Sequence, residues 1–236
     1  NSLALLKKEG IDTEYVNFTE GVSTGVAMIP VDEKGENSII VASGANALLS
    51  EADVDAAKEL ISNASIVLMQ LETPIPTLIH AAKIAHSAGV KVVLNPAPFP
   101  KEPLPAEFLE NVDLIIPNET EITGMTGVKI SDEASIKKAM LGISSLGVKN
   151  VVLTAGGAGA YLLENDELVN VPTFKTTVVD TTAAGDTFCG SLCVALSQGE
   201  SLKNAVRFAN KAASISVSRM GAWRSIPQKD EVTDWK

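Results

Sequence analysis

The sequence predicts an α/β protein with a mostly parallel central sheet, together with a small β element near its start. The first observation is a series of short β-branched runs that are apolar on both faces, as a covered parallel sheet requires. The second is that helical segments lie between these runs, and this alternation is typical of the α/β class. The third is a pair of strand-like segments joined by a polar turn, which predicts a hairpin.

The predicted elements follow one another along the chain. The opening residues read as a helix that is closed by Gly10. The hairpin segments are 24–31 and 37–41. The predicted strands of the central sheet are 66–69, 91–94, 113–116 and 150–154. The predicted helices are 51–62, 75–88, 104–110, 132–146, 186–198 and 202–217.

Composition argues against several functional classes. The formal net charge of −10 disfavours broad binding to nucleic acid or to anionic membranes. No run of 18 apolar residues occurs, so we expect no membrane span, and no signal peptide is visible. Low cysteine usage fits a reducing compartment, which makes the cytoplasm the expected location. The chain opens on Asn1 within a helix, so we expect that an upstream segment is absent and that any transit peptide to an organelle would lie in it.

Residues 178–188 are the segment most informative about chemistry. They read as a strand end, a turn of small residues and a helix start. Because Ala183, Ala184 and Gly185 carry almost no side chain, a ligand can approach their backbone N–H groups, which together with the helix dipole form an anion site. Asp186 is the only charged side chain in that turn, and it is suited to take a proton from a hydroxyl that attacks a phosphoryl group. The alternative is that Asp186 only caps the helix.

Three other segments follow predicted strands. Residues 154–159 contain three glycines, which would let the backbone lie close to a nucleotide, although a plain strand-to-strand turn looks the same. Asn118 and Glu121 follow strand 113–116, at the edge where α/β sheets bind ligands, and Glu121 is suited to hold Mg²⁺ through water. Glu72 lies at another strand end. For both acids, the alternative is a capped helix start.

Other catalytic patterns are weak or absent. Cys189 and Cys193 read as two apolar side chains on one helix and cannot by themselves form a four-ligand zinc site. His80 and His86 have no Cys as partner and no Asp in their own predicted helix, so a Ser-His-Asp hydrolase is poorly supported. The chain has no Gly-x-x-x-x-Gly-Lys-Ser/Thr motif, which excludes a P-loop protein. It also lacks a Gly-x-Gly-x-x-Gly at an opening βα turn, so a Rossmann dehydrogenase is a poor alternative.

A family resemblance rests on the signature Asp-Thr-Thr-Ala-Ala-Gly-Asp-Thr-Phe at 180–188, with supporting segments at 24–27, 43–46, 95–98 and 117–121. Together these segments resemble the ribokinase-like, or PfkB, family of sugar and nucleoside kinases. The Ala-Ala-Gly-Asp form, with Met-Gln-Leu-Glu at 69–72, is most similar to its ribokinase branch. The resemblance implies a three-layer α/β/α sandwich, formed by 1–22 and 43–236, and a small β-sheet lid with its hairpin at 23–42.

The resemblance also implies an activity: ATP-dependent phosphorylation of D-ribose at its O5 hydroxyl, giving ribose 5-phosphate and ADP, with Mg²⁺ and K⁺ as cofactors. Asp186 would be the catalytic base, and the N–H groups of Ala183, Ala184 and Gly185 would stabilise charge on the γ-phosphoryl group. Glu72 would contact the sugar together with Asp186. Ala27 and Ile39 of the lid hairpin would lie over the sugar.

The same resemblance implies nucleotide and metal sites. The residues implied to bind ATP are Asn118, Glu121, Thr154, Ala155, Gly156, Gly157, Ala158, Gly159, Gly185, Asp186 and Asn210. The residues implied to surround K⁺ are Asp180, Thr182, Ser216, Arg219, Gly221 and Ser225, mostly through carbonyl and hydroxyl oxygens. The cation would order the anion-hole turn and would take no part in bond making.

The chain departs from the family pattern at its start. Family members begin with a strand that bears a sugar-binding Asp and continue to a Gly-Gly-Lys-Gly-Ala-Asn segment, and neither occurs here. We therefore expect the chain by itself to bind sugar poorly. Two alternatives stay open: a kinase for another sugar, such as fructose or 2-keto-3-deoxygluconate, and a non-catalytic, nucleotide-binding regulatory subunit. A homodimer formed through the lid sheets is also left open.

Overall fold

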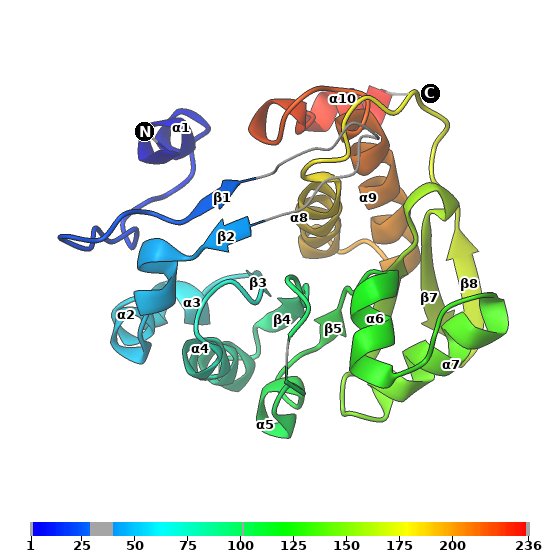
Figure 1. Cartoon of the computed structure of the whole chain (residues 1–236), viewed down its shortest axis with the longest axis horizontal. Coiled ribbons are helices and arrows are strands. Elements are labelled where there is room, and N and C mark those ends of the chain that lie inside the picture. The colour runs from blue at the N-terminus through cyan, green and yellow to red at the C-terminus, as the bar shows by residue number, and fades with distance from the viewer. Residues whose placement is uncertain (1, 29–39, 101, 235–236) are drawn as a thin grey trace.

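A computed structural model describes residues 2–28, 40–100 and 102–234, and a six-stranded sheet lies at its centre (Figure 1). The strand order is β3-β4-β5-β6-β7-β8. Strands β3 to β6 are mutually parallel, whereas β7 and β8 are antiparallel to their neighbours. The strands are β3 (Ile66–Met69), β4 (Lys91–Leu94), β5 (Leu114–Ile115), β6 (Asn150–Thr154), β7 (Ala160–Glu164) and β8 (Glu167–Val171).

Helices cover both faces of this sheet, which gives three layers (Figure 1). Alternate residues of β4 explain why: Val92 and Leu94 pack into the core on one face, and Val93 packs into the core on the other. The first face is covered mainly by α4 (Ile75–Ser87), α5 (Ala106–Leu109), α6 (Glu119–Thr126) and α7 (Glu133–Ser144). The second is covered by α8 (Ala184–Ser197) and α9 (Leu202–Ser216).

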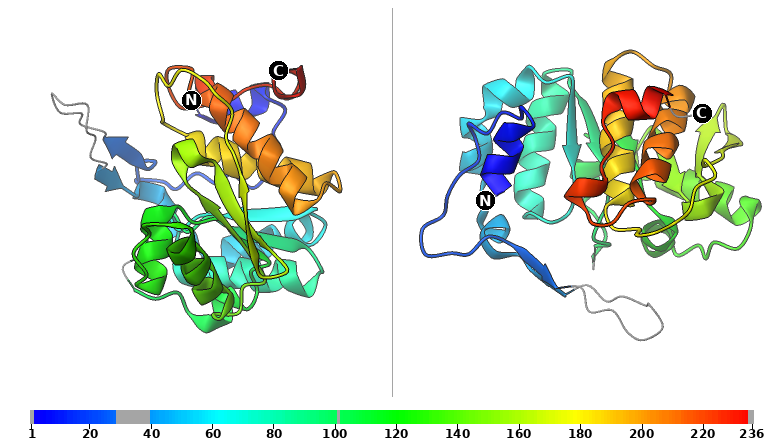
Figure 2. Two further views of the ribbon diagram at one scale, coloured as in Figure 1. Left: turned by 90° about the vertical axis from the view of Figure 1, so that its right-hand side faces the viewer. Right: turned by 90° about the horizontal axis from the view of Figure 1, so that it is seen from above.

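A two-stranded antiparallel sheet projects from this body (Figure 2). It consists of β1 (Val26–Met28) and β2 (Ile40–Ala42), with Ala27 opposite Val41. The predicted hairpin is therefore confirmed in its pairing, although Ile39 lies outside the described residues. The remaining helices are α1 (Ser2–Lys8), α2 (Glu51–Ala56), α3 (Lys58–Ser62) and α10 (Lys229–Asp234). In the part of the chain that the structure describes, no helix has both the length and the apolar character needed to cross a membrane.

Two local predictions were wrong, and one hairpin was missed. The segment before the small-residue turn, 178–180, forms no strand; instead the backbone N–H groups of Val179 and Asp180 donate to the carbonyl of Val217. The hairpin of β7 and β8 was not predicted, so the glycine-rich stretch after β6 is a strand-to-strand connection. Helix α8 begins at Ala184 and not at residue 186.

Candidate active site

Polar side chains gather where the parallel strands end. Gln70 follows β3, Asn95 follows β4, Asn118 follows β5 and Thr154 closes β6. Because the strands are parallel, these residues share the carboxyl edge of the sheet, which is where open α/β sheets bind ligands. The N-terminus of α8 also lies at this edge, since Gln70 donates a hydrogen bond to Asp186.

Asp186 occupies the third position of α8, and its carboxylate is exposed. The N-cap is Ala183, which has a left-handed backbone (φ 59°, ψ 14°) and makes no side-chain cap. Asp186 Oδ1 accepts from Gln70 Nε2 at 3.0 Å. Within the described ranges, its Oδ2 accepts no hydrogen bond. The alternative in which Asp186 only caps the helix is therefore wrong, and one carboxylate oxygen is available to a substrate.

A cavity of about 320 Å³ lies at the end of β3, and Gln70, which donates to Asp186, is among the residues that line it. Its lining includes Gln70 and Glu72, which was predicted to contact sugar, and it is completed by Asn46, Leu68, Met69, Thr73 and Leu78. The volume falls at the low end of the range for small-molecule sites. Glu72 itself is exposed. The cavity and Asp186 thus share Gln70 as a common neighbour.

Asn118 and Glu121 form a reciprocal cap at the start of α6. Asn118 Oδ1 accepts from the Glu121 N–H, while the two oxygens of Glu121 accept from the backbone N–H and the Nδ2 of Asn118, all at 2.8–2.9 Å. Glu121 is buried, and its burial raises the pKa of the carboxyl group. Each oxygen of Glu121 thus already accepts one hydrogen bond from Asn118.

The glycine-rich loop, residues 154–159, lies next to the α6 cap, so two of the segments predicted to bind nucleotide are neighbours. Thr154 pairs with Asn118 in an isolated parallel bridge, so the loop starts beside the α6 cap. A Cβ on Gly156 or Gly157 would meet nothing within 4 Å, which leaves open space over the loop. Gly159 differs, because a Cβ there would lie 2.3 Å from the Val171 carbonyl oxygen. A glycine is therefore required at position 159 because the backbone there packs against the end of β8, and no ligand is needed to explain it.

Asn210 of α9 contacts the segment just after β8, against which Gly159 also packs. It is buried, and its Nδ2 donates to the carbonyl oxygens of Val171 and Pro172, at 2.7 and 3.3 Å. Asn210 thus anchors the chain just after β8, where Gly159 also packs. The structure brings the glycine-rich loop and Asn210 together through this shared segment.

Asp180 ties the small-residue turn to the segment that follows α9. Its Oδ1 accepts from the Thr182 N–H at 2.9 Å and its Oδ2 from the Gly221 N–H at 2.8 Å. Hydrogen bonds from Thr182, and then from Gly221, hold the pKa of this carboxyl below its usual value. Ser216 and Ser225 are both fully buried and lie 2.9 Å apart, hydroxyl to hydroxyl.

No group of three His, Cys, Asp or Glu side chains that could hold a metal occurs in residues 2–28, 40–100 and 102–234. The Ser225 hydroxyl donates to the Ala222 carbonyl, so it is already part of a buried hydrogen-bond chain. The Arg219 side chain pairs with Glu231, which leaves only its backbone carbonyl for the predicted role.

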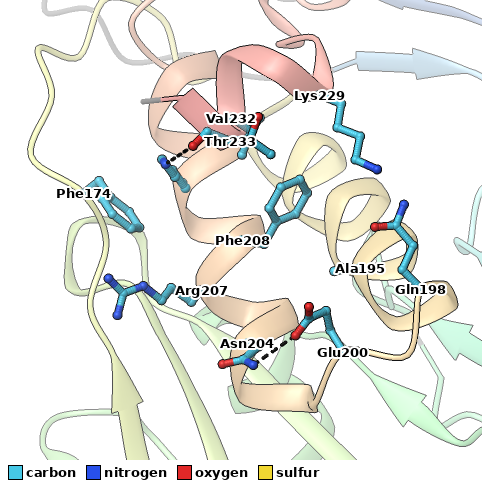
Figure 3. A pocket seen from close by; sticks show the side chains of 11 residues that line it. Phe174, Ala195, Gln198, Glu200, Asn204, Arg207, Phe208, Lys229, Val232 and Thr233 are labelled. Atoms are coloured by element: carbon cyan, nitrogen blue, oxygen red, sulfur yellow. Dashed lines mark hydrogen bonds between the residues drawn. The ribbon is translucent and has the colours of Figure 1, made fainter. Parts of the chain in front are cut away.

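Other features lie apart from this site. Ala27 is on β1 and lines neither of two cavities found in the described chain. A second cavity, of about 610 Å³, lies between α8, α9 and α10 around Phe208 (Figure 3). Its rim carries Arg207, Lys211 and Lys229, and none of the predicted site residues lines it. It is therefore not part of the candidate active site.

Two residues at the site had no predicted role. Gln70 contacts Asp186, and Asn95 contacts Gln70 at 3.1 Å. A signal was present in the sequence, because each is a polar amide directly after a short apolar strand. However, the contact between Gln70 and Asp186 spans 116 residues, and no local pattern reports it.

Comparisons with known proteins agree with this geometry. A model of the pfkB family of carbohydrate kinases matches residues 2–229. Ribokinase from Staphylococcus aureus (strain COL) is 42% identical over 223 residues, which cover 94% of this chain and 73% of that protein. The structure of Arabidopsis thaliana ribokinase complexed with ribose and ATP superposes with a TM-score of 0.85 at 36% identity, covering 90% of this chain and 69% of that one. For ribokinase from Giardia lamblia the TM-score is 0.88 at 31% identity, with coverages of 99% and 78%.

Proposed function

The chain belongs to the pfkB family of carbohydrate kinases, and we propose that it transfers the γ-phosphoryl group of ATP to the primary O5 hydroxyl of D-ribose. The observation that carries the proposal is the exposed Asp186 carboxylate at the N-terminus of α8, joined by a hydrogen bond to Gln70, which with Glu72 lines a cavity. The Arabidopsis relative was solved with both ribose and ATP, which supports the choice of substrates.

In the proposed reaction, Asp186 acts as the general base. The sugar O5–H gives its proton to Asp186 Oδ2 while O5 forms a bond to the γ-phosphorus. The bond from that phosphorus to the β,γ-bridging oxygen breaks, and ADP leaves with the electron pair. Glu72 is proposed to bind sugar hydroxyls in the neighbouring cavity. Ala27 is proposed to cover the sugar from the lid.

The backbone around α8 is proposed to stabilise the transferred group. Ala183, Ala184 and Gly185 carry no side chain that could block their N–H groups, and a Cβ on Gly185 would enter open space. Such N–H groups at a helix N-terminus favour negative charge. ATP would lie along the open surface of Gly156 and Gly157.

Mg²⁺ and K⁺ are the metal ions proposed to act with ATP. Glu121 would hold Mg²⁺ through water, beside Asn118, which already donates one hydrogen bond to each of its oxygens. The oxygens of Asp180, Thr182, Ser216, Arg219, Gly221 and Ser225 would surround K⁺. When bound, these ions supply positive charge that offsets phosphate charge and orders the anion-hole turn. We also propose that lid hairpins pair in a homodimer, because Val26, Met28 and Val41 expose apolar side chains.

The test is ATP consumption with and without D-ribose, in a buffer containing K⁺ and Mg²⁺. It is run on this chain alone and on this chain joined to the N-terminal segment of the Staphylococcus aureus relative, of which it covers 73%. We expect ribose-dependent ADP release that falls on the order of 10²-fold or more in Asp186→Ala, because a general base is lost. Fructose and 2-keto-3-deoxygluconate are the comparison substrates.

Each outcome separates the alternatives. Turnover with another sugar but not with ribose would change the substrate and keep the mechanism. ATP binding without any sugar-dependent turnover in either chain would favour the regulatory subunit. Full activity of Asp186→Ala would contradict the assignment of the base.

A further inference from the structure

A directional hydrogen-bond chain ends on Asp186. It starts at the carbonyl oxygen of Ile116, which accepts from Asn95 Nδ2 at 2.8 Å. Asn95 Oδ1 then accepts from Gln70 Nε2 at 3.1 Å, and the same Nε2 donates to Asp186 Oδ1 at 3.0 Å. The chain runs across the ends of β5, β4 and β3 to the first turn of α8.

The direction of this chain is fixed by its first member. A backbone carbonyl can only accept, so Asn95 must turn its NH₂ group toward Ile116 and its oxygen toward Gln70. Gln70 must then present its own NH₂ group, whose two hydrogens serve Asn95 and Asp186. The Asn95 backbone N–H also donates to the Met69 carbonyl at 2.9 Å, which fixes the position of Asn95 against β3.

We propose that Gln70, oriented by Asn95, is a positioning residue for Asp186: its amide occupies Oδ1, so that Oδ2 is the oxygen that receives the sugar proton. The inference rests on the proposed function of Asp186 as base. An N–H that permanently faces Oδ1 disfavours a proton on that oxygen. It also holds a side chain that would otherwise rotate freely at the exposed end of a helix.

Gln70 is placed to link substrate binding to the base. It lines the 320 Å³ cavity together with Glu72, two residues further on. The contact with Asp186 is made at an exposed carboxylate, so the fold of α8 does not depend on it. A displacement of the base by about 1 Å is enough to cost on the order of 10²-fold in rate.

The pH profile of kcat is to be interpreted through the titratable groups near Asp186. Glu72 follows β3, and Glu121 lies at the start of α6. Cys189, one turn along α8, is buried; burial raises the pKa of its thiol, so the thiol carries no charge near neutral pH. The buried residues of α9, which packs against α8, include no titratable side chain. None of the ion pairs among the described residues involves Asp186.

Two substitutions of Gln70 test the proposal by kcat, the KM for each substrate, and the pH profile of kcat. Gln70→Leu removes the donor, and we expect kcat to fall roughly 10- to 10²-fold while the KM for ATP stays within about 2-fold. Gln70→Glu keeps the size but places a second carboxylate beside Asp186. Because two carboxylates this close do not ionise independently, we expect the acid limb of the profile to move up by roughly one pH unit or more.

Gln198 provides the matched control. It lies at the C-terminal end of α8, is exposed and lines only the second cavity (Figure 3). Gln198→Leu and Gln198→Glu are expected to retain the parent kcat and pH profile. The proposal is overturned if Gln70→Leu loses no more kcat than Gln198→Leu, or if Gln70→Glu keeps the parent acid limb. Such a result, with Asp186→Ala still inactive, would leave the proposed function intact; an active Asp186→Ala would instead overturn the base itself.

Discussion

Helices α6 and α8 begin at the same edge of the sheet and carry a carboxylate at the same helical position. Glu121 is the third residue of α6, and Asp186 is the third residue of α8. An acid at this position is favourable in any helix, because it faces the positive end of the helix dipole. Nevertheless, the two carboxylates are held in opposite ways.

The difference begins with the residue at the N-cap. Asn118 engages both oxygens of Glu121, and the carboxyl group is 5% exposed. Ala183 has no side-chain acceptor or donor, so Asp186 receives nothing from its own helix start. It is held instead from the sheet, by Gln70, at one oxygen only. A helix can therefore present a reactive carboxylate in its first turn when its cap residue offers no reciprocal bond.

The largest effect on stability is expected from the capped helix. Asn118→Ala removes the side chain that caps α6 and one of the donors to buried Glu121, so we expect the free energy of unfolding to fall by about 1–2 kcal/mol. Chemical denaturation measures this change. The control is Asp186→Ala, which we expect to change the same quantity by less than about 0.5 kcal/mol. Equal losses in the two variants would mean that both helices depend on their first-turn acids.

The pH dependence of stability should also separate two carboxylates. Burial raises the pKa of Glu121 above its usual 4.5, so its contribution to stability is complete below that value and is lost as pH rises through the pKa in the folded state. We expect the stability of the parent relative to Glu121→Gln to decrease as pH rises above about 4.5.

Asp180 is the control, because its effect on the free energy of unfolding should change with pH in the opposite direction. Its pKa is lowered from the usual 3.8, so its contribution is present above that value and is lost as pH falls through the pKa in the folded state. The stability of the parent relative to Asp180→Asn should therefore fall on acidification. Chemical denaturation at several pH values measures both changes. If the stability difference from the parent varied with pH in the same direction for Glu121→Gln and Asp180→Asn, the opposite pKa shifts of the two carboxyl groups would be contradicted.

The sheet could be predicted where its strands are short, continuous apolar runs. Strands 66–69, 91–94 and 150–154 have the predicted bounds, because runs of Val, Ile and Leu with apolar neighbours on both sides fit little else. The hairpin of β7 and β8 was missed because β8 is half-exposed and its pattern is weak. The glycines before it carried a nucleotide-binding signal that concealed their role as a strand connection.

The site was predictable only in its local parts. The small-residue turn and Asp186 stand next to each other in the sequence, and the Asn118 and Glu121 cap is a four-residue pattern. By contrast, the start of α8 depends on the left-handed backbone of Ala183. This conformation cannot be predicted from an alanine, because alanine rarely adopts it. The contact between Gln70 and Asp186 depends on how the chain closes around the sheet, and this closure is a property of the tertiary fold.

The smallest expected change in stability concerns Ala183, at the uncapped start of α8. Ala183 adopts φ 59°, where a Cβ costs roughly 1 kcal/mol and glycine does not. We therefore expect Ala183→Gly to raise the free energy of unfolding by about 0.5 kcal/mol, after the greater entropy of glycine in the unfolded chain is subtracted. Ala184→Gly is the matched control, since the same change one residue later, inside α8, should lower stability by up to about 1 kcal/mol. If both variants lose stability, the strain at Ala183 is not what distinguishes this helix start. If they diverge in thermal melts as expected, the uncapped start of α8 carries a conformational cost that the capped start of α6 does not, and this cost accompanies the free carboxylate.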